Sequence, residues 1–402
     1  MILESWDEVL ILKNYLGYCY YYLTKTHSLR LTKSTIALST GVSLSILLLL
    51  FIPANILKSN NVWATAIEIP VYMLTTRGNL EQLQGVQGEY GYNDKYALLD
   101  INQLFTECPT EIAIFVHGWG VDHYKAKERL DRVKMSLENN NYYIPLIGLS
   151  WDSNTEWDPA KSIAKENGPE LAQFILDYKE TCKYEQNKDV NVRLLAHSMG
   201  SRVVLSALQS LHENPVWNNS TNNFKIASVH LMGAALDNEE VSMNPIDHFN
   251  YPAWGQGPLG CYPYHYYPGD GIKFPYGNAI AGEVVKFYNL INPEDNVLEY
   301  IYPCFEGGDN ALGEDGEQES GILPPPNSVY IEEDIQDEIK PYHDADAIDG
   351  WDFGLCNSFD FCLVNTGDNH AGYIGFRNPT NTNLLADDGA MNIVVEHWRS
   401  DG

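Results

Sequence analysis

The sequence predicts an α/β protein in which a mostly parallel sheet carries helices on both faces. Short apolar runs alternate with longer helical patterns after about residue 66, which is typical of such a sheet. Hydrophobic residues make up 44% of the 402 residues, which is enough for a substantial core. Loops at the carboxyl ends of parallel strands are the usual place for chemistry, so we expect the functional residues there.

Five predominantly apolar runs predict the strands of this sheet. They cover residues 112–116, 143–149, 190–195, 226–232 and 284–290. Helical patterns follow the second and third of these runs, at 159–178 and 202–211. A strand that is apolar at every position, rather than at alternate ones, is typical of burial on both faces.

Two stretches interrupt this rhythm and are interpreted as insertions in a single domain over 67–402. Residues 241–280 are dense in Pro, Gly and Tyr, and residues 305–352 are acidic and loop-rich. The first insertion has two interpretations, a lid or apolar acyl site and a surface loop held around Cys261. Within the acidic insertion, the closely spaced carboxylates of 343–350 could bind calcium. The segment lacks the regular Asp spacing and the terminal Glu of an EF-hand loop, so a solvated acidic loop is the favoured interpretation.

The amino-terminal part of the chain has a different character. Residues 34–57 are 24 uncharged residues with a strongly apolar centre, about the length that crosses a bilayer as a helix. We interpret 1–33 as a cytoplasmic leader, 34–57 as a signal peptide or transmembrane anchor, and 58–66 as a linker or cleavage region. The alternative is a buried core helix. Either favoured interpretation places the domain after residue 66 outside the cytoplasm, extracellular or tethered to a membrane.

The charge balance excludes some partners. There are 54 acidic and 25 basic side chains, which gives a formal net charge of −29. Residues 1–66 carry +2, so the rest of the chain carries −31. Nucleic-acid binding requires a basic face to meet phosphates, so we expect no nucleic-acid partner.

Cysteine usage agrees with export. Six of the seven cysteines follow the apolar segment, and an even set in an exported domain suggests up to three disulfides. Six buried thiols are the alternative. No Cys/His spacing indicates zinc, so we predict neither a metal nor another cofactor for catalysis. Residues 218–221 contain overlapping N-glycosylation sequons.

The strongest chemical signal lies in residues 194–202, LLAHSMGSR. A buried strand runs into a small-x-Ser-x-Gly turn and a helix follows at once, which is the context of a nucleophile elbow centred on Ser198. The flanking positions must be small because the turn is tight. Ala196 stands where the common pattern has Gly, and alanine is small enough.

A second signal, residues 115–120 (FVHGWG), also ends a predicted strand. In acyl transfer the tetrahedral intermediate carries an oxyanion that requires preorganised N–H donors. The main-chain N–H groups of Trp119 and of Met199, which follows the nucleophile, are the predicted donors. The alternative is a plain glycine turn with a structural His117.

A serine nucleophile needs a base, and the base needs an acid to orient it. In this topology both are expected after Ser198, the acid first. Asp295 directly follows the strand at 284–290 and is the predicted acid, with Asp237 as the alternative. A solvated loop carboxylate is the alternative for either residue.

For the base, His370 is the best candidate because it lies in a glycine-containing loop near the carboxyl terminus. His397 competes, but it follows an apolar run without a loop glycine. A surface-loop histidine is the alternative for His370.

With these motifs in place, the chain from about residue 67 resembles an α/β-hydrolase. Within that superfamily it resembles poorly characterised lipase- and esterase-like proteins that share the HGW, SWDS-like and AHSMGS segments. Here these segments are His117–Trp119, Ser150–Ser153 and Ala196–Ser201. The resemblance covers most of 110–300 and also 360–376, and it specifies mechanism better than substrate.

The resemblance implies a serine hydrolase that cleaves a small-molecule or lipid carboxylic ester. His370 is expected to take the proton of Ser198, with Asp295 orienting the imidazole and the Trp119 and Met199 N–H groups binding the oxyanion. A peptidase or thioesterase uses the same residues. A catalytically inactive hydrolase fold that serves as a surface binding module is the alternative from another class.

Overall fold

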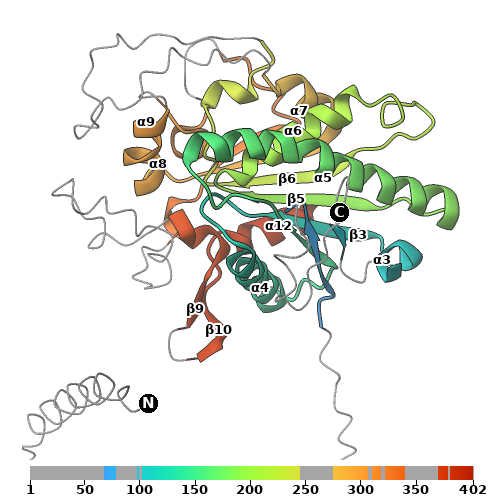
Figure 1. Ribbon diagram of the computed structural model, residues 1–402, viewed down its shortest axis with the longest axis horizontal. Coiled ribbons are helices and arrows are strands. Elements are labelled where there is room, and N and C mark those ends of the chain that lie inside the picture. The colour runs from blue at the N-terminus through green and yellow to red at the C-terminus, as the bar shows by residue number, and fades with distance from the viewer. Residues whose placement is uncertain are drawn as a thin grey trace, which may run out of the picture. The chain divides into compact units, whose positions relative to one another are not determined.

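One sheet organises the part of the chain that the structure describes (Figure 1). The computed structural model describes residues 68–77, 97–98, 102–244, 275–306, 310–317, 322–339, 370–378 and 381–401. The strands of the sheet are β1 (Val71–Thr75), β2 (Ala97–Leu98), β3 (Glu111–Val116), β4 (Leu146–Ser150), β5 (Asn191–His197), β6 (Ile226–Met232), β7 (Val284–Ile291) and β8 (Tyr330–Asp334).

The sheet has the order β2-β1-β4-β3-β5-β6-β7-β8. Each neighbouring pair is parallel, apart from the edge pair β1–β2, which is antiparallel. The predicted mostly parallel sheet is therefore confirmed. Because parallel strands end at one edge, the loops after β3, β5 and β7 meet there.

Helices cover both faces of this sheet (Figure 1). The described helices are α3 (Asn102–Glu107), α4 (His123–Asn139), α5 (Trp157–Gln186), α6 (Gly200–Glu213), α7 (Gly277–Glu283), α8 (Asn296–Tyr300), α9 (Tyr302–Phe305), α10 (Leu312–Asp315) and α12 (Met391–Asp401). Short 3₁₀ turns are η2 (Asn238–Val241), η4 (Gln336–Glu338) and η7 (His370–Ile374), and β9 (Phe376–Asn378) pairs with β10 (Asn381–Asp387). Helices α5, α6 and α7 pack into one apolar core, and α4 and α12 into the other.

Successive side chains of the central strands enter these two cores in turn. Ile114 lies in the core under α5 and α6, and Phe115 in the core under α4 and α12. Leu194 and Leu195 alternate in the same way on β5. All four are at most 1% exposed, which explains why apolar residues predominate in the predicted strands.

The structure also differs from the sequence expectations in places. The predicted strand at 143–149 begins only at Leu146, directly after Pro145, and the predicted helix at 159–178 lies within the longer α5. Strand β8 lies inside the stretch 305–352, so part of that acidic region belongs to the sheet.

Several predicted segments lie outside the described residues. They are the segments 1–33, 34–57 and 58–66, most of the insertion at 241–280, and the acidic loop at 343–350. Among the helices that the structure describes, none is long and apolar enough to span a membrane.

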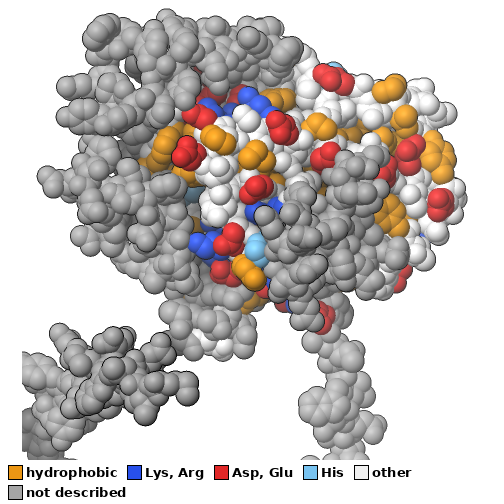
Figure 2. All heavy atoms as spheres, viewed as in Figure 1, with side chains coloured by type: hydrophobic (Ala, Val, Ile, Leu, Met, Phe, Trp, Pro, Cys, Tyr) orange, Lys and Arg blue, Asp and Glu red, His pale blue; other side chains and the backbone are white. Residues whose placement is uncertain are grey.

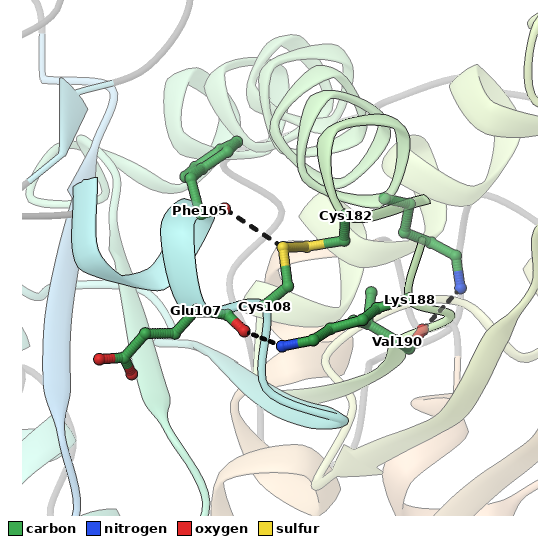
Figure 3. Close-up of a disulfide and its surroundings, with 7 residues drawn as sticks. Phe105, Glu107, Cys108, Cys182, Lys188 and Val190 are labelled. Atoms are coloured by element: carbon green, nitrogen blue, oxygen red, sulfur yellow. Dashed lines mark hydrogen bonds between the residues drawn. A yellow bond between two sulfur atoms is a disulfide. The ribbon is translucent and has the colours of Figure 1, made fainter. Parts of the chain in front are cut away.

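One disulfide joins Cys108, just before β3, to Cys182 near the end of α5 (Figure 3). Their Cα atoms lie 5.5 Å apart, and both side chains are fully buried. Lys188 donates a hydrogen bond to the carbonyl of Glu107 beside the bridge. The prediction of up to three disulfides, which named no pairing, is therefore confirmed for one pair among the described cysteines. Cys261, Cys356, Cys362 and the side chain of Cys304 lie outside the description.

Candidate active site

Ser198 occupies the sharp turn between β5 and α6. The strand ends at His197, the helix begins at Gly200, and Ser198 has a φ of 55°. A non-glycine residue in this left-handed region costs about 1–3 kcal/mol, so the surrounding structure must hold it there. Part of that support is the hydrogen bond from the Ser198 N–H to the carbonyl of Met232, 3.0 Å long.

Two glycines allow the turn after β3 to approach Ser198. The register pairs Val116 with Ala196, so the residues that follow each strand lie next to each other. A Cβ on Gly118 would lie 2.7 Å from the Ser198 Cβ, and one on Gly200 would lie 2.6 Å from the Val116 carbonyl oxygen. Any side chain at these positions displaces backbone, which explains the small residues in both motifs.

The buried ring of His117 stabilises the turn after β3 through two hydrogen bonds. The Trp151 N–H donates to His117 Nε2 over 3.3 Å, so the ring proton resides on Nδ1, which donates to the Gly118 carbonyl over 2.9 Å. Burial lowers the pKa of His117 well below its usual value, with Arg77 adding to the effect. The ring is therefore neutral at physiological pH, and it fixes the turn rather than titrating.

The SWDS segment, residues 150–153, forms hydrogen bonds with the same turn through Ser153. The Ser153 hydroxyl accepts from the Val121 N–H and donates to the Val121 carbonyl, at 3.1 and 3.0 Å. The Gly120 N–H donates to the Ser153 carbonyl over 3.0 Å. The HGWG and SWDS segments therefore form one hydrogen-bonded unit.

Trp119 and Met199, the predicted oxyanion donors, lie on the two turns that meet at Ser198. The Trp119 indole donates to the Thr155 carbonyl over 2.7 Å and packs against Trp157, with ring centroids 5.1 Å apart. Met199 is the N-cap residue of α6. The first N–H groups of a helix have no acceptor within it, so they suit an anion.

Asp295 and His370 come together although they lie 75 positions apart in the sequence. His370 Nδ1 lies 2.7 Å from Asp295 Oδ2. Because a carboxylate only accepts, the proton of this bond resides on Nδ1 and Nε2 is left as the basic nitrogen. Asp295 is fully buried and His370 is 8% exposed, so the pair is shielded from water.

The other oxygen of Asp295 fixes the carboxylate. Asp295 follows β7 and is the N-cap of α8, where Oδ1 accepts from the N–H groups of Val297 and Leu298 at 3.0 and 3.1 Å. One oxygen is thus held by the helix while the other faces the imidazole.

His370 lies beside the Ser198 turn through its contact with His197. His197 Nε2 donates to the His370 carbonyl over 2.8 Å, and the two rings have centroids 4.8 Å apart. His197 is covalently joined to Ser198, so the structure gathers the predicted nucleophile, base and acid at one end of the sheet. Their catalytic roles stay predictions.

Asp237, the alternative acid, belongs to a different group of side chains. It accepts a hydrogen bond from the Tyr302 hydroxyl and lies 3.9 Å from Nη2 of Arg202. Arg202 also pairs with Glu240 at 2.5 Å and with Glu306 at 3.7 Å, all nearly fully buried. Its described partners therefore differ from those of Asp295, and no histidine is among them.

His397, the competing base, lies on α12. Its Nε2 lies 2.9 Å from Glu333 Oε2, and its Nδ1 lies 3.2 Å from Nε2 of His230. The ring stacks on Tyr288, with centroids 4.0 Å apart. These partners belong to β6, β7 and β8 on the α4/α12 face of the sheet.

Sequence reasoning did not single out Tyr373, whose ring lies beside the predicted base His370, with ring centroids 6.2 Å apart. Its ring packs against Gly233, where a Cβ would lie 2.7 Å from Cε2 of the ring. Burial raises the pKa of Tyr373 well above its usual value, and the neighbouring Asp295 carboxylate raises it further. The phenol therefore stays protonated beside the carboxylate. Tyr373 follows His370 by three residues, and no sequence motif marks a tyrosine at this position.

The described residues offer no cluster of side chains that could bind a metal ion. No group of three or more His, Cys, Asp or Glu side chains there could hold a metal ion. Acidic and basic side chains lie scattered among apolar ones on the described surface in Figure 2.

Comparison with known proteins agrees with this architecture. Residues 97–250 match a family of α/β-hydrolases of unknown function. The mostly parallel sheet with helices on both faces and this match together show an α/β-hydrolase fold. The matched residues include both turns of the candidate site, whereas Asp295 and His370 lie beyond them. No curated protein matches the sequence.

Solved structures with which the chain aligns include a siderophore hydrolase, a cutinase and an esterase. The siderophore hydrolase EstB from Aspergillus fumigatus is 21% identical, with 33% of this chain and 37% of that chain covered and a TM-score of 0.23. A Trichoderma reesei cutinase is 16% identical, with 34% and 60% covered and a TM-score of 0.22. An esterase from the archaeon Pyrobaculum calidifontis is 10% identical, with 56% and 66% covered and a TM-score of 0.28. The alignments thus span less than two thirds of each of these proteins.

Proposed function

We propose that the chain is a serine hydrolase that cleaves carboxylic esters through an acyl-enzyme intermediate. The observation that carries this proposal is the buried Asp295–His370 pair, 2.7 Å apart, beside Ser198 in its left-handed turn. A nucleophile, a base and an orienting acid in this chain order are what acyl transfer requires. The substrate class is a small-molecule or lipid ester.

In the proposed mechanism Ser198 Oγ attacks the ester carbonyl while His370 Nε2 takes its proton. Asp295 stabilises the resulting imidazolium through the Nδ1 hydrogen bond and does not itself become protonated. The imidazolium then protonates the leaving alkoxide as the carbon–oxygen bond breaks. Water, deprotonated by the same imidazole, attacks the acyl-serine and releases the carboxylic acid.

The negative charge of the tetrahedral intermediate requires donors that are already in place. In the proposal the main-chain N–H groups of Trp119 and Met199 supply them from the two turns that meet at Ser198. The first turn of α6 adds a favourable field at this point. Removing one such donor in comparable sites costs about 10²–10³ in kcat, so the rigidity of the HGWG–SWDS unit matters.

The proposal is tested by labelling with a fluorophosphonate probe. We expect the wild-type protein to be labelled on Ser198 and to hydrolyse p-nitrophenyl esters, and the Ser198→Ala variant to do neither. Circular dichroism should show that the variant keeps its fold, because the hydroxyl is removed without creating a large cavity. Unlabelled wild-type protein would favour the inactive binding module, and turnover by the variant would exclude Ser198 as nucleophile.

We also propose that residues 67–402 lie outside the cytoplasm, either secreted or tethered through the amino-terminal segment. The Cys108–Cys182 bridge supports this because disulfides persist chiefly in oxidising compartments. Thiol trapping at lysis, followed by mass spectrometry, should recover the two cysteines as a disulfide. Recovery of two alkylated thiols would contradict the proposal.

A further inference from the structure

His197 is a buried histidine that the proposed mechanism does not use. It ends β5 and is only 2% exposed, directly before Ser198. Its Nε2 lies 2.8 Å from the His370 carbonyl oxygen. It therefore connects the residue that precedes the nucleophile with the backbone of the proposed base.

The protonation state of His197 follows from its surroundings. A carbonyl oxygen only accepts, so the ring proton must reside on Nε2. The Nδ1 atom is buried and has no hydrogen-bond partner among the described residues. Burial holds the pKa of His197 well below its usual value, and electrostatic interactions with His370 and Arg129 add to the effect. The side chain is thus a neutral donor with one acceptor.

That acceptor lies at the start of the 3₁₀ turn η7, which carries the base. Farther along this turn, the Tyr373 carbonyl accepts from the Ala390 N–H over 3.0 Å, which ties it to the start of α12. At His370 the ring is held by Asp295 and the carbonyl by His197. Of these two bonds, only the one from His197 connects His370 to β5, the strand that leads into Ser198.

We propose that His197 is a positioning residue, whose Nε2–H holds the His370 backbone at a fixed distance from the Ser198 turn. This inference rests on the proposed function, because it assigns the base to His370. A misplacement of about 1 Å in such a pair can cost about 10² in rate. The bond therefore affects the chemical step rather than substrate binding.

Two substitutions of His197 separate the hydrogen bond from the packing. His197→Leu fills a similar volume without a donor, and His197→Gln offers an amide N–H at a reach comparable to Nε2. With p-nitrophenyl acetate we expect the leucine variant to lose about 10–100-fold in kcat with KM within about twofold. The glutamine variant should recover most of this loss, and the fluorophosphonate labelling rates should follow the same order.

His230→Leu is the matched control. His230 is also buried and sits on the adjacent strand β6, and burial lowers its pKa well below the usual value. Among the described residues, its ring contacts His397, Tyr288 and Trp398 and none of the proposed catalytic residues. We expect this variant to lose stability but to keep the wild-type kcat per folded molecule. An equal kcat loss in both leucine variants, or no rescue by glutamine, would overturn the positioning role.

Hydrogen exchange gives a reading that does not depend on turnover. Amides of residues 370–375 should exchange faster in His197→Leu than in the wild type, and His197→Gln should restore their protection. If the fluorophosphonate probe does not label the wild-type protein, the proposed function fails. The exchange pattern still shows whether the His197–His370 hydrogen bond is present. If it is labelled and His197→Leu keeps full kcat and protection, the inference fails and the function stands.

Discussion

Asp295 performs two tasks with its two oxygens, which makes it the most informative residue of the site. Oδ1 caps α8 through two N–H groups, and Oδ2 faces His370. A loss of activity on substitution therefore mixes a structural with a chemical effect. Asparagine separates them, because its amide oxygen can still cap the helix while its NH₂ group cannot accept the imidazole proton.

We expect Asp295→Asn to lower kcat by about 10⁴-fold, the size of loss known when a triad acid becomes an amide and the histidine takes the wrong tautomer. Its melting temperature should stay close to that of the wild type. Asp295→Ala should lose a similar amount of activity and about 1 kcal/mol more stability, because the cap is removed as well. Ester hydrolysis and thermal unfolding of the two variants check this.

The matched control for the acid is Asp237→Asn. Asp237 interacts with Tyr302 and Arg202, so its substitution should destabilise the fold and leave kcat per folded molecule near the wild-type value. If this variant, and not Asp295→Asn, abolished turnover, the acid assignment would be reversed.

Glu314 provides a pH-dependent stability signal near the acid. Burial, with the charges of Asp315, Glu299 and Asp295, raises its pKa from 4.5 to about 8. The folded state therefore keeps a proton that the unfolded state loses between these values, so Glu314 lowers the free energy of unfolding as pH rises over that interval. We expect Glu314→Gln to gain stability relative to the wild type from about pH 5 to 8, and no further above it. Urea unfolding at several pH values checks this, and a constant difference between the two proteins would contradict it.

At this scale the sequence predicts some residues much better than others. Ser198 follows from a motif whose strand, turn and helix are all visible in the residues. The sequence does not decide between Asp295 and Asp237, because both follow a predicted strand in an acidic chain. The side chains that they contact lie far away in the sequence, His370 for Asp295 and Tyr302 for Asp237. The same holds for the His197 contact, since a histidine inside the motif does not indicate its partner.

At the scale of elements, the two turns that meet at Ser198 depend on glycines for different reasons. Gly200 needs space, because a Cβ there would lie 2.6 Å from a backbone oxygen that cannot move alone. Gly120 has a φ of 70°, and a Cβ added there would meet nothing within 4 Å, so only its backbone conformation is demanding.

This difference predicts unequal costs for the same substitution. We expect Gly200→Ala to lose about 3 kcal/mol or to fail to accumulate as soluble protein, because overpacking meets backbone. Gly120→Ala should lose only about 1–2 kcal/mol, the cost of a left-handed alanine. Chemical denaturation of both variants measures the two losses, and equal losses would show that space at Gly200 is not the deciding factor.

Elements that the sequence predicted differ physically from those it did not. The strand at 112–116 is buried on both faces, so it appears as an unbroken apolar run. Strand β8, with the sequence YIEED, lies at the sheet edge and is mostly half-buried, so its acidic residues hide the pattern. Edge strands tolerate charge because one side meets solvent.

At the scale of the whole molecule, the disulfide connects the start of the central sheet to the longest helix. It closes a loop of 74 residues in sequence separation, for which chain entropy predicts about 4 kcal/mol of stabilisation. We expect Cys108→Ser with Cys182→Ser to lose roughly that amount, and the wild type to lose it on reduction. Thermal unfolding with and without dithiothreitol measures this, and an unchanged midpoint would show that the bridge does not stabilise the fold.

The close approach of Gly118 to the Ser198 side chain has a consequence for protein engineering. With 2.7 Å between a hypothetical Cβ and the serine, neither turn has room to gain a side chain that faces the other. Libraries that randomise 117–118 and 197–200 should therefore yield mostly insoluble clones. Diversity in substrate preference has to be introduced through the chain that leaves the sheet elsewhere, after β6 and β7. We expect selection for a new ester to accumulate substitutions there and to leave the two turns unchanged.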